Sequence, residues 1–214
     1  MEGIETTTVG GMVQLLAARY LPNGYRYYVS GLVPERKDPR AVDQKIMMKY
    51  AIAENRWARY RRKREGQVNL RYLRHGRRFL ILATGPHGAH PFFEQELAVR
   101  DVEAVPIRFD GYELSFRGGQ VWVRIDRKAF REFRQRVLGN ALKKEVSALI
   151  NEFRSLPYEP YRSVRYQMFR LLDEVNQRRK AAGLPRVPDW VVPSRRKSRR
   201  VFERQESLPG TALK

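Results

Sequence analysis

The sequence contains no cysteine, and it holds only three histidines. The first absence excludes disulfides, thiolate nucleophiles and cysteine-based zinc sites. The second leaves little room for a Ser-His-Asp triad. The apolar runs are much shorter than the roughly 20 residues that a membrane-spanning helix needs. The polar, Thr-rich N-terminal residues lack the basic and apolar parts of a secretory signal, so we expect a cytoplasmic protein.

Acidic residues are also scarce relative to basic ones. The chain has 43 Lys and Arg against 23 Asp and Glu, a formal net charge of +20. A compact chain with such an excess repels itself, and a polyanionic partner is the usual reason for it. A general preference for arginine would explain the excess without any partner. No long basic helix offers a clean lipid-facing side, so we expect no membrane partner.

Apolar residues that alternate with polar ones, between glycine-containing turns, predict strands. The expected strands are residues 25–33, 68–73, 78–84, 105–109, 112–117 and 120–125. The continuous apolar run at residues 79–83 indicates a strand buried on both faces and covered by helices. Asp110-Gly111 and Gly118-Gly119 are two-residue hairpin turns, which predict a three-stranded meander over residues 105–125.

Helix signals lie on both sides of the predicted meander. Asp38 followed by Pro39 is a typical helix start, and apolar residues recur at spacings of three and four as far as Tyr60. We therefore expect one helix over residues 38–64, with Gly66 as its C-cap. After Asp126, which can cap a helix, the remaining apolar pattern up to residue 183 is helical.

These elements predict an α+β fold, with a mixed or antiparallel sheet covered by a long helix, then a C-terminal helical region and a basic tail. The expected organisation is a flexible leader at 1–11, an α+β nucleic-acid-binding domain at 12–126 and a packed helical region at 127–183. Residues 184–214 are the expected tail, with little core of its own. The tail carries a net charge of +5 from eight basic and three acidic residues, so most of the excess belongs to the rest of the chain.

Basic residues gather in three clusters, and together these predict a surface that binds phosphates. Arginine predominates, and its planar guanidinium suits bidentate contacts with phosphate and stacking on bases. The first cluster is at the end of the predicted long helix: Arg56, Arg59, Arg61, Arg62, Lys63 and Arg64. The second surrounds the turn at residues 75–76: Arg71, Arg74, Arg77 and Arg78. The third is in the tail: Arg195, Arg196, Lys197, Arg199 and Arg200.

Tyrosines are interleaved with the cations around the first predicted strand. Tyr28 lies on the opposite strand face from Tyr25 and Tyr27, so at least one of these faces should expose a ring. An exposed tyrosine beside arginines suits single-stranded nucleic acid, because bases stack on the ring while phosphates pair with the cations. Tyr28 is the expected stacking residue.

Two of the histidines lie in one loop bounded by glycine and proline. His87 and His90, with Glu94 and Glu96 just beyond, could hold a divalent metal ion. The alternative is an ordinary polar surface loop, because a loop spacing does not fix the ligands in space.

The stretch NGYRYYV at residues 23–29, then a long basic helix, then a strand leading to the histidines at residues 79–90, resembles the REP-associated tyrosine transposases. The resemblance to these single-strand DNA transposases of the HUH type covers residues 20–95 at most. It implies a metal-dependent enzyme, with Mg²⁺ or Mn²⁺ as cofactor and a tyrosine nucleophile on a later helix, for which Tyr166 is the candidate. The family's two strand histidines flanking one bulky apolar residue are not matched here.

The sequence therefore predicts a protein that binds DNA or RNA, single-stranded or structured, and that needs no cofactor. Two alternatives stay open. One is a strand transferase or nuclease of a mobile element, active or degenerate. The other is a basic scaffold protein of a larger assembly, which would have no affinity of its own for free nucleic acid.

Overall fold

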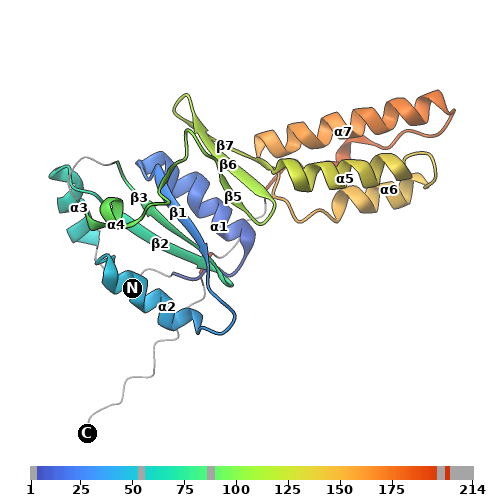
Figure 1. Cartoon of the computed structure of the whole chain (residues 1–214). Helices are drawn as coiled ribbons and strands as arrows, with labels where there is room; N and C mark the ends of the chain where they lie inside the picture. The colour runs from blue at the N-terminus through green and yellow to red at the C-terminus, as the bar shows by residue number, and fades with distance from the viewer. Residues whose placement is uncertain (1–3, 53–55, 86–89, 197–200, 203–214) are drawn as a thin grey trace, which may run out of the picture.

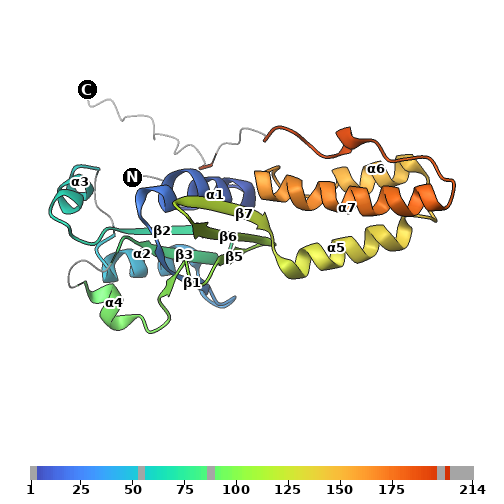
Figure 2. The same cartoon turned by 90° about the horizontal axis from the view of Figure 1, so that it is seen from above.

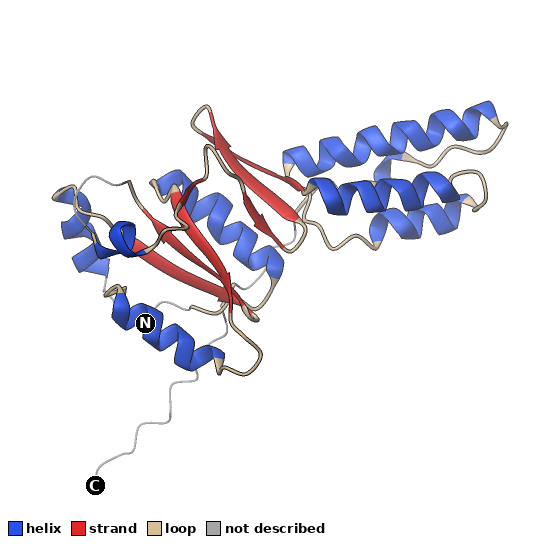
Figure 3. Cartoon of the chain, viewed as in Figure 1, coloured by secondary structure: helices blue, strands red, loops and turns tan. Residues whose placement is uncertain are grey.

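The computed structural model describes residues 4–52, 56–85, 90–196 and 201–202. The chain folds into two antiparallel sheets with helices around and beyond them, which confirms the predicted α+β class (Figures 1 and 3). A region built on a four-stranded sheet lies at one end of the molecule and a helical region lies at the other. A three-stranded sheet lies between them (Figure 1).

The four-stranded sheet has the order β2-β3-β1-β4. Its strands are β1 (Tyr27–Leu32), β2 (Leu70–His75), β3 (Arg78–Ala83) and β4 (Arg100–Asp101). As predicted, β3 is a central strand, paired with β1 on one side and β2 on the other. Its Leu80 and Leu82 are fully buried. Because successive residues of a strand face opposite sides, this sheet needs cover on both faces.

One face of the four-stranded sheet is covered by α1 (Val9–Leu15), the single π-helical turn η1 (Leu16–Tyr20) and the 3₁₀ turn η2 (Leu21–Asn23). The Thr8 side chain caps α1 by accepting a hydrogen bond from the Gly11 amide. Glu5 pairs with Arg74 of β2 in an isolated parallel bridge. The expectation of a flexible leader is therefore wrong for the described residues 4–11, which are part of the folded region.

The other face of this sheet packs against a second apolar cluster that includes Tyr50, Ile52 and Phe92. The helices on this side are α2 (Pro39–Lys49) and the short α4 (Pro91–Gln95), whereas no described residue of α3 (Arg56–Arg64) belongs to this cluster. Asp38 caps α2 as predicted, accepting from the amides of Arg40 and Ala41.

The expected single helix over residues 38–64 is wrong, because the chain turns after α2. Ala51 adopts a left-handed conformation with φ of 49°, and the Ile52 amide donates to the Met47 carbonyl. This break lets both Tyr50 and Ile52 enter the core, where they are 3% and 7% exposed. A continuous helix would carry such neighbouring side chains to different faces.

The predicted meander is present as β5 (Ile107–Phe109), β6 (Tyr112–Arg117) and β7 (Gln120–Ile125). Three helices follow it: α5 (Arg127–Asn140), α6 (Val146–Arg154) and α7 (Arg162–Ala181). Asp126 caps α5 as predicted. The Gln167 side chain of α7 bonds both the amide and the carbonyl of Ile125, which joins the helical region to the free edge of β7.

The chain after residue 183 contributes to both cores, so the expectation of a tail with little core of its own is wrong for its described part. Val187, Val191 and Val192, around the turn η3 (Asp189–Val191), are buried in the helical region. Farther on, Phe202 pairs with Thr6 in an antiparallel bridge beside α1.

No helix in the described part of the chain is both long and apolar enough to cross a membrane.

Candidate nucleic-acid interface

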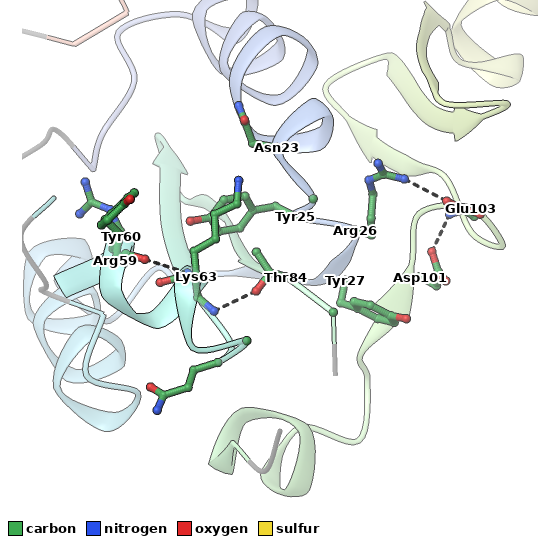
Figure 4. A pocket seen from close by; sticks show the side chains of 15 residues that line it. Asn23, Tyr25, Arg26, Tyr27, Arg59, Tyr60, Lys63, Thr84, Asp101 and Glu103 are labelled. Carbon is green, nitrogen blue, oxygen red and sulfur yellow. Dashed lines mark hydrogen bonds and ion pairs between the residues drawn. The ribbon is translucent and has the colours of Figure 1, made fainter. Parts of the chain in front are cut away.

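A groove of about 910 Å³ opens between the start of β1, helix α3 and the loop after β4 (Figure 4). We call it the tyrosine groove because three tyrosines line it. The lining residues are Asn23, Gly24, Tyr25, Arg26, Tyr27, Arg59, Tyr60, Lys63, Gly66, Gln67, Asn69, Thr84, Gly85, Asp101 and Glu103. They come from segments far apart in the sequence, so the groove is a product of the tertiary fold.

A tight turn before β1 delivers two of the three tyrosines. Gly24 adopts a φ of 92°, which an L side chain rarely adopts, and its amide closes the turn on the Leu21 carbonyl. Tyr25 then packs edge-to-face on Tyr20, and Tyr27 packs edge-to-face on Phe93, each pair with ring centroids 5.5 Å apart. Tyr25 and Tyr27 are each partly exposed. Their orientation is therefore set by aromatic neighbours while part of each ring meets solvent.

Helix α3 forms the opposite wall and supplies Arg59, Tyr60 and Lys63 (Figure 4). Its C-terminus is stopped by Gly66, with φ of 68°, while the Gln67 amide donates to the Arg62 carbonyl at 2.8 Å. Six of its nine residues are basic and none is acidic. A helix of this composition has no face to bury, and the Tyr60 ring is 61% exposed.

The floor of the groove joins α3 to the sheet. The backbone amide of Asn69 donates to the Thr84 hydroxyl at 2.9 Å. The side-chain amide of Asn69 donates to the Arg59 carbonyl at 3.3 Å. These bonds hold the end of β3 and the middle of α3 at a fixed separation. The width of the groove is thus determined by hydrogen bonds rather than by the long basic side chains.

Two carboxylates lie at the rim, on Asp101 at the end of β4 and on Glu103 just after it. Asp101 accepts from the Glu103 amide, and Glu103 forms an ion pair with Arg26 at 3.0 Å. The guanidinium of Arg26 also stacks on the Phe116 ring and donates to the Leu21 carbonyl. Arg26 therefore neutralises the Glu103 carboxylate and ties the groove to the three-stranded sheet.

The first predicted cluster, on α3, is on the surface. Arg61, Lys63 and Arg64 are exposed, and no hydrogen bond or ion pair within the described residues engages their side chains. Arg59 lines the groove and Arg62 is half-buried. Arg56 begins the helix, but its side chain lies outside the described residues. These cations surround Tyr60 with positive charge.

The second predicted cluster does not form one phosphate surface. Arg74 is 3% exposed, and its guanidinium binds the carboxylates of Asp43 and Glu5 at 2.9 and 2.8 Å. Arg77 donates to the carbonyls of residues 33, 34, 35 and 37, and so fastens the loop before α2. Both predictions are wrong because the fold uses these two cations internally.

The other two arginines of this cluster go to different places. Arg78 is exposed and forms an ion pair with Asp110 at 3.2 Å. The guanidinium of Arg71 lies 5.9 Å from the centroid of the Tyr20 ring, so it lies beside η1.

The prediction that Tyr28 stacks on bases is wrong, because this ring is only 2% exposed. Its hydroxyl donates toward the carbonyls of Val105 and Pro106, and burial raises the pKa of the phenol. The helices that cover this face of β1 are what hides it. The strand alternation predicts that Tyr25 and Tyr27 share the face opposite Tyr28, and the helical apolar pattern includes Tyr60. The density of charge on α3 was the signal that Tyr60 could not be covered.

Of the tail cluster, Arg195 and Arg196 are exposed, and Lys197, Arg199 and Arg200 lie outside the described residues. The Arg196 guanidinium stacks over Tyr161, 4.8 Å from the ring centroid. The tail cluster therefore begins in contact with the N-terminal end of α7.

The predicted metal and catalytic residues are not brought together in the described part of the chain. His90 caps α4, where its Nδ1 accepts from the Phe92 amide at 3.1 Å, and His87 lies outside the described residues. Within those residues no group of three potential ligands is close enough for a metal ion. Tyr166 is on α7, and α4 lies at the other end of the molecule (Figures 1 and 2). The enzymatic alternative stays a prediction.

Chemically, the tyrosine groove offers ring faces, guanidinium and ammonium groups, and amides within one opening. Such a set can contact bases and phosphates at the same time. No protein-family model matches the chain, and no curated protein sequence matches it either.

Proposed function

We propose that this protein binds single-stranded nucleic acid in the tyrosine groove. One observation supports this proposal above the others: three partly exposed tyrosines line the same groove as helix α3. That helix has six basic residues among nine and no acidic one. Bases would stack on the rings, and phosphates would lie along α3.

Tyr25 and Tyr27 are suited to stacking because their rings are already held in place and lose little conformational entropy on binding. Tyr25 and Tyr27 are each held by an edge-to-face neighbour, so binding restrains few additional torsions. Tyr60 faces them across the groove and supplies a second ring surface (Figure 4). Stacking of a base on an aromatic side chain contributes about 1–3 kcal/mol and accepts every base.

The charge on α3 supports a polyanionic ligand. Arg61, Lys63 and Arg64 are exposed in the last turn of α3, where Lys63 also lines the groove, and no ion pair within the described residues neutralises them. Binding would release the cations condensed on the phosphates, and because these cations gain entropy, the affinity depends on salt.

Unpaired strands fit this geometry better than a duplex does. Ring faces inside a groove are reached by bases that are unstacked, and a duplex hides those faces. We expect the protein to act in the cytoplasm with its nucleic-acid partner and to need no cofactor.

The test is fluorescence anisotropy with a labelled single-stranded DNA, the matching RNA and a duplex, each at two salt concentrations. We expect single strands to bind more tightly than duplex, and affinity to fall as salt rises. Tyr25→Ala and Tyr60→Ala should each weaken binding by about 1–3 kcal/mol, a factor of roughly 5 to 150.

Tyr28→Phe is the control, because it changes a tyrosine close in sequence to Tyr25 that is buried away from the groove. Its affinity should equal that of the wild type. If no nucleic acid binds, the protein is better explained as a basic scaffold. If binding occurs but the groove variants match the wild type, the groove is the wrong site.

A further inference from the structure

A second row of exposed basic and aromatic side chains lies on α7, in the helical region. Arg162, Tyr166 and Arg170 follow one another at intervals of four residues, so they share one face of the helix. All three are exposed, and the Tyr166 ring is 64% exposed. The guanidinium of Arg170 lies 5.9 Å from the centroid of that ring.

Packing does not explain this row. The opposite side of α7 supplies the buried residues of the helical core, among them Val164, Met168 and Leu171. Arg162 and Arg170 form no ion pair within the described residues. The carboxylate nearest in sequence on the helix is Asp173, so residues 161–172 contain three arginines and no acidic residue.

Strand β7 and the chain after η3 bring further aromatic and basic side chains to the start of α7. Trp122 of β7 is 41% exposed and lines a small cavity of about 150 Å³ together with Tyr161 and Arg162. The Arg196 guanidinium lies over the same Tyr161 ring, at 4.8 Å from its centroid. We call this set of residues the α7 surface: Trp122, Arg162, Tyr166, Arg170, Arg195 and Arg196.

We propose that the α7 surface is a second contact site for the same single-stranded nucleic acid. This inference rests on the proposed function for the identity of the ligand. The argument is charge complementarity: the surface combines four arginines with two exposed rings, which matches phosphates and bases in the way that the tyrosine groove does.

The two sites lie in different parts of the molecule. The tyrosine groove is beside α3 and β1, whereas the α7 surface is on the helical region beyond the three-stranded sheet (Figures 1 and 2). A strand long enough to reach both would bind each with the effective concentration that the other provides. A short strand would occupy the groove alone. Strand length therefore separates the two sites.

The experiment compares two double variants of the full chain that remove the same charge from the same helix. Arg162→Ala/Arg170→Ala changes the α7 surface, and Arg178→Ala/Lys180→Ala changes exposed cations of the last turn of α7, which begin about 12 Å beyond Arg170 along the helix. Each is titrated with labelled oligothymidines of about 8 and about 40 nucleotides over a series of salt concentrations.

We expect the Arg162/Arg170 variant to bind the long strand at least tenfold more weakly than the wild type, and the short strand unchanged. The log–log salt slope for the long strand should fall by about 1.4, which is two contacts at about 0.7 each. The Arg178/Lys180 variant should lose less than threefold for both strands. Equal losses in the two variants would overturn the inference, because then only the total charge matters.

The rings give an independent readout. In a Trp57→Phe/Trp190→Phe background, the fluorescence of Trp122 should be quenched by the long strand and not by the short one. Tyr166→Ala should weaken binding of the long strand, whereas Tyr166→Phe, which keeps the ring, should not.

Failure of this inference can be told apart from failure of the proposed function. If the wild type binds neither strand, the proposed function fails. If it binds both, and the groove variants weaken binding while the α7-surface variants and Trp122 show no response, the second site alone is refuted.

Discussion

Among the described residues, the sheet region and the helical region each bury one arginine, and they satisfy its guanidinium by different means. In the sheet region, Arg74 is 3% exposed and binds two carboxylates, those of Asp43 and Glu5. In the helical region, Arg179 is 2% exposed and donates only to carbonyls, those of Ala141, Lys144 and Pro185. Arg74 forms part of an ionic network. Arg179 instead donates hydrogen bonds to backbone carbonyls at the ends of two segments.

The difference shows that a basic composition serves folding as well as binding. Arg74 links β2 to α2 and to the N-terminal segment, with the Tyr72 hydroxyl donating to Asp43 at 2.6 Å. Arg179 fastens the loop after α5 and the chain after α7 to one point. Among the arginines left on the surface, those on α3 and on the first half of α7 belong to the two sites that we propose for a ligand.

Arg74→Ala should have the largest effect on stability. It would leave the buried Asp43 carboxylate without its cation, and removal of one partner of a buried pair typically costs about 3–5 kcal/mol. Urea denaturation would measure the loss in the free energy of unfolding. Adding Asp43→Asn should recover part of it, because the orphaned charge is then gone. No recovery would mean that Arg74 acts mainly through packing.

Arg179→Ala should destabilise the chain by a smaller amount, about 2–3 kcal/mol, because it orphans carbonyls and not a charge. The same denaturation series measures it. A loss as large as that of Arg74→Ala would break the comparison between the regions. Exposed Arg178 is the matched control, and Arg178→Ala should change the free energy of unfolding by less than about 0.5 kcal/mol.

Ala51→Gly should stabilise the sheet region by about 1 kcal/mol. Ala51 holds a φ of 49° between α2 and the chain that leads to α3, and glycine adopts this conformation without the strain that a Cβ causes. The midpoint of thermal unfolding should rise. A lower midpoint would show that the methyl group of Ala51 contributes more by packing than it loses in backbone strain.

Glu96→Gln should have the smallest effect, and the effect should depend on pH. Hydrogen bonds from Tyr50 and Lys49 lower the pKa of Glu96 below its ordinary value of 4.5, so its contribution is present above that value and is lost as the pH falls through the lowered pKa. We expect the variant to be about 0.5–1 kcal/mol less stable at pH 7, and the difference to shrink as the pH falls through the lowered pKa of Glu96. Denaturation at a series of decreasing pH values checks this. A difference that does not change with pH would assign the effect to packing.

Local signals in the sequence were sufficient for much of the fold. The caps at Asp38 and Asp126 and the turns at Asp110-Gly111 and Gly118-Gly119 fixed where elements begin and turn. The uninterrupted apolar run of β3 indicated a central strand, because both faces of it had to be covered. These features depend on neighbours close in sequence.

The errors concern burial by distant parts of the chain. Ala51 favours helix locally, and the break there comes from the core that takes up Tyr50 and Ile52. Tyr28 is hidden, and Arg74 is paired, by segments that no local pattern connects to them. In the cluster on α3, Arg61, Lys63 and Arg64 are exposed, as expected for a helix with six cations among nine residues.

The most direct test of the central claim is the salt dependence of single-stranded DNA binding by the wild type and by Arg61→Ala/Lys63→Ala/Arg64→Ala. If α3 places phosphates along the tyrosine groove, the wild-type affinity should fall linearly on a log–log plot. The slope of the variant should then be shallower by about 2, which is three contacts at about 0.7 each. A wild-type affinity indifferent to salt, or equal slopes for the two proteins, would contradict the account.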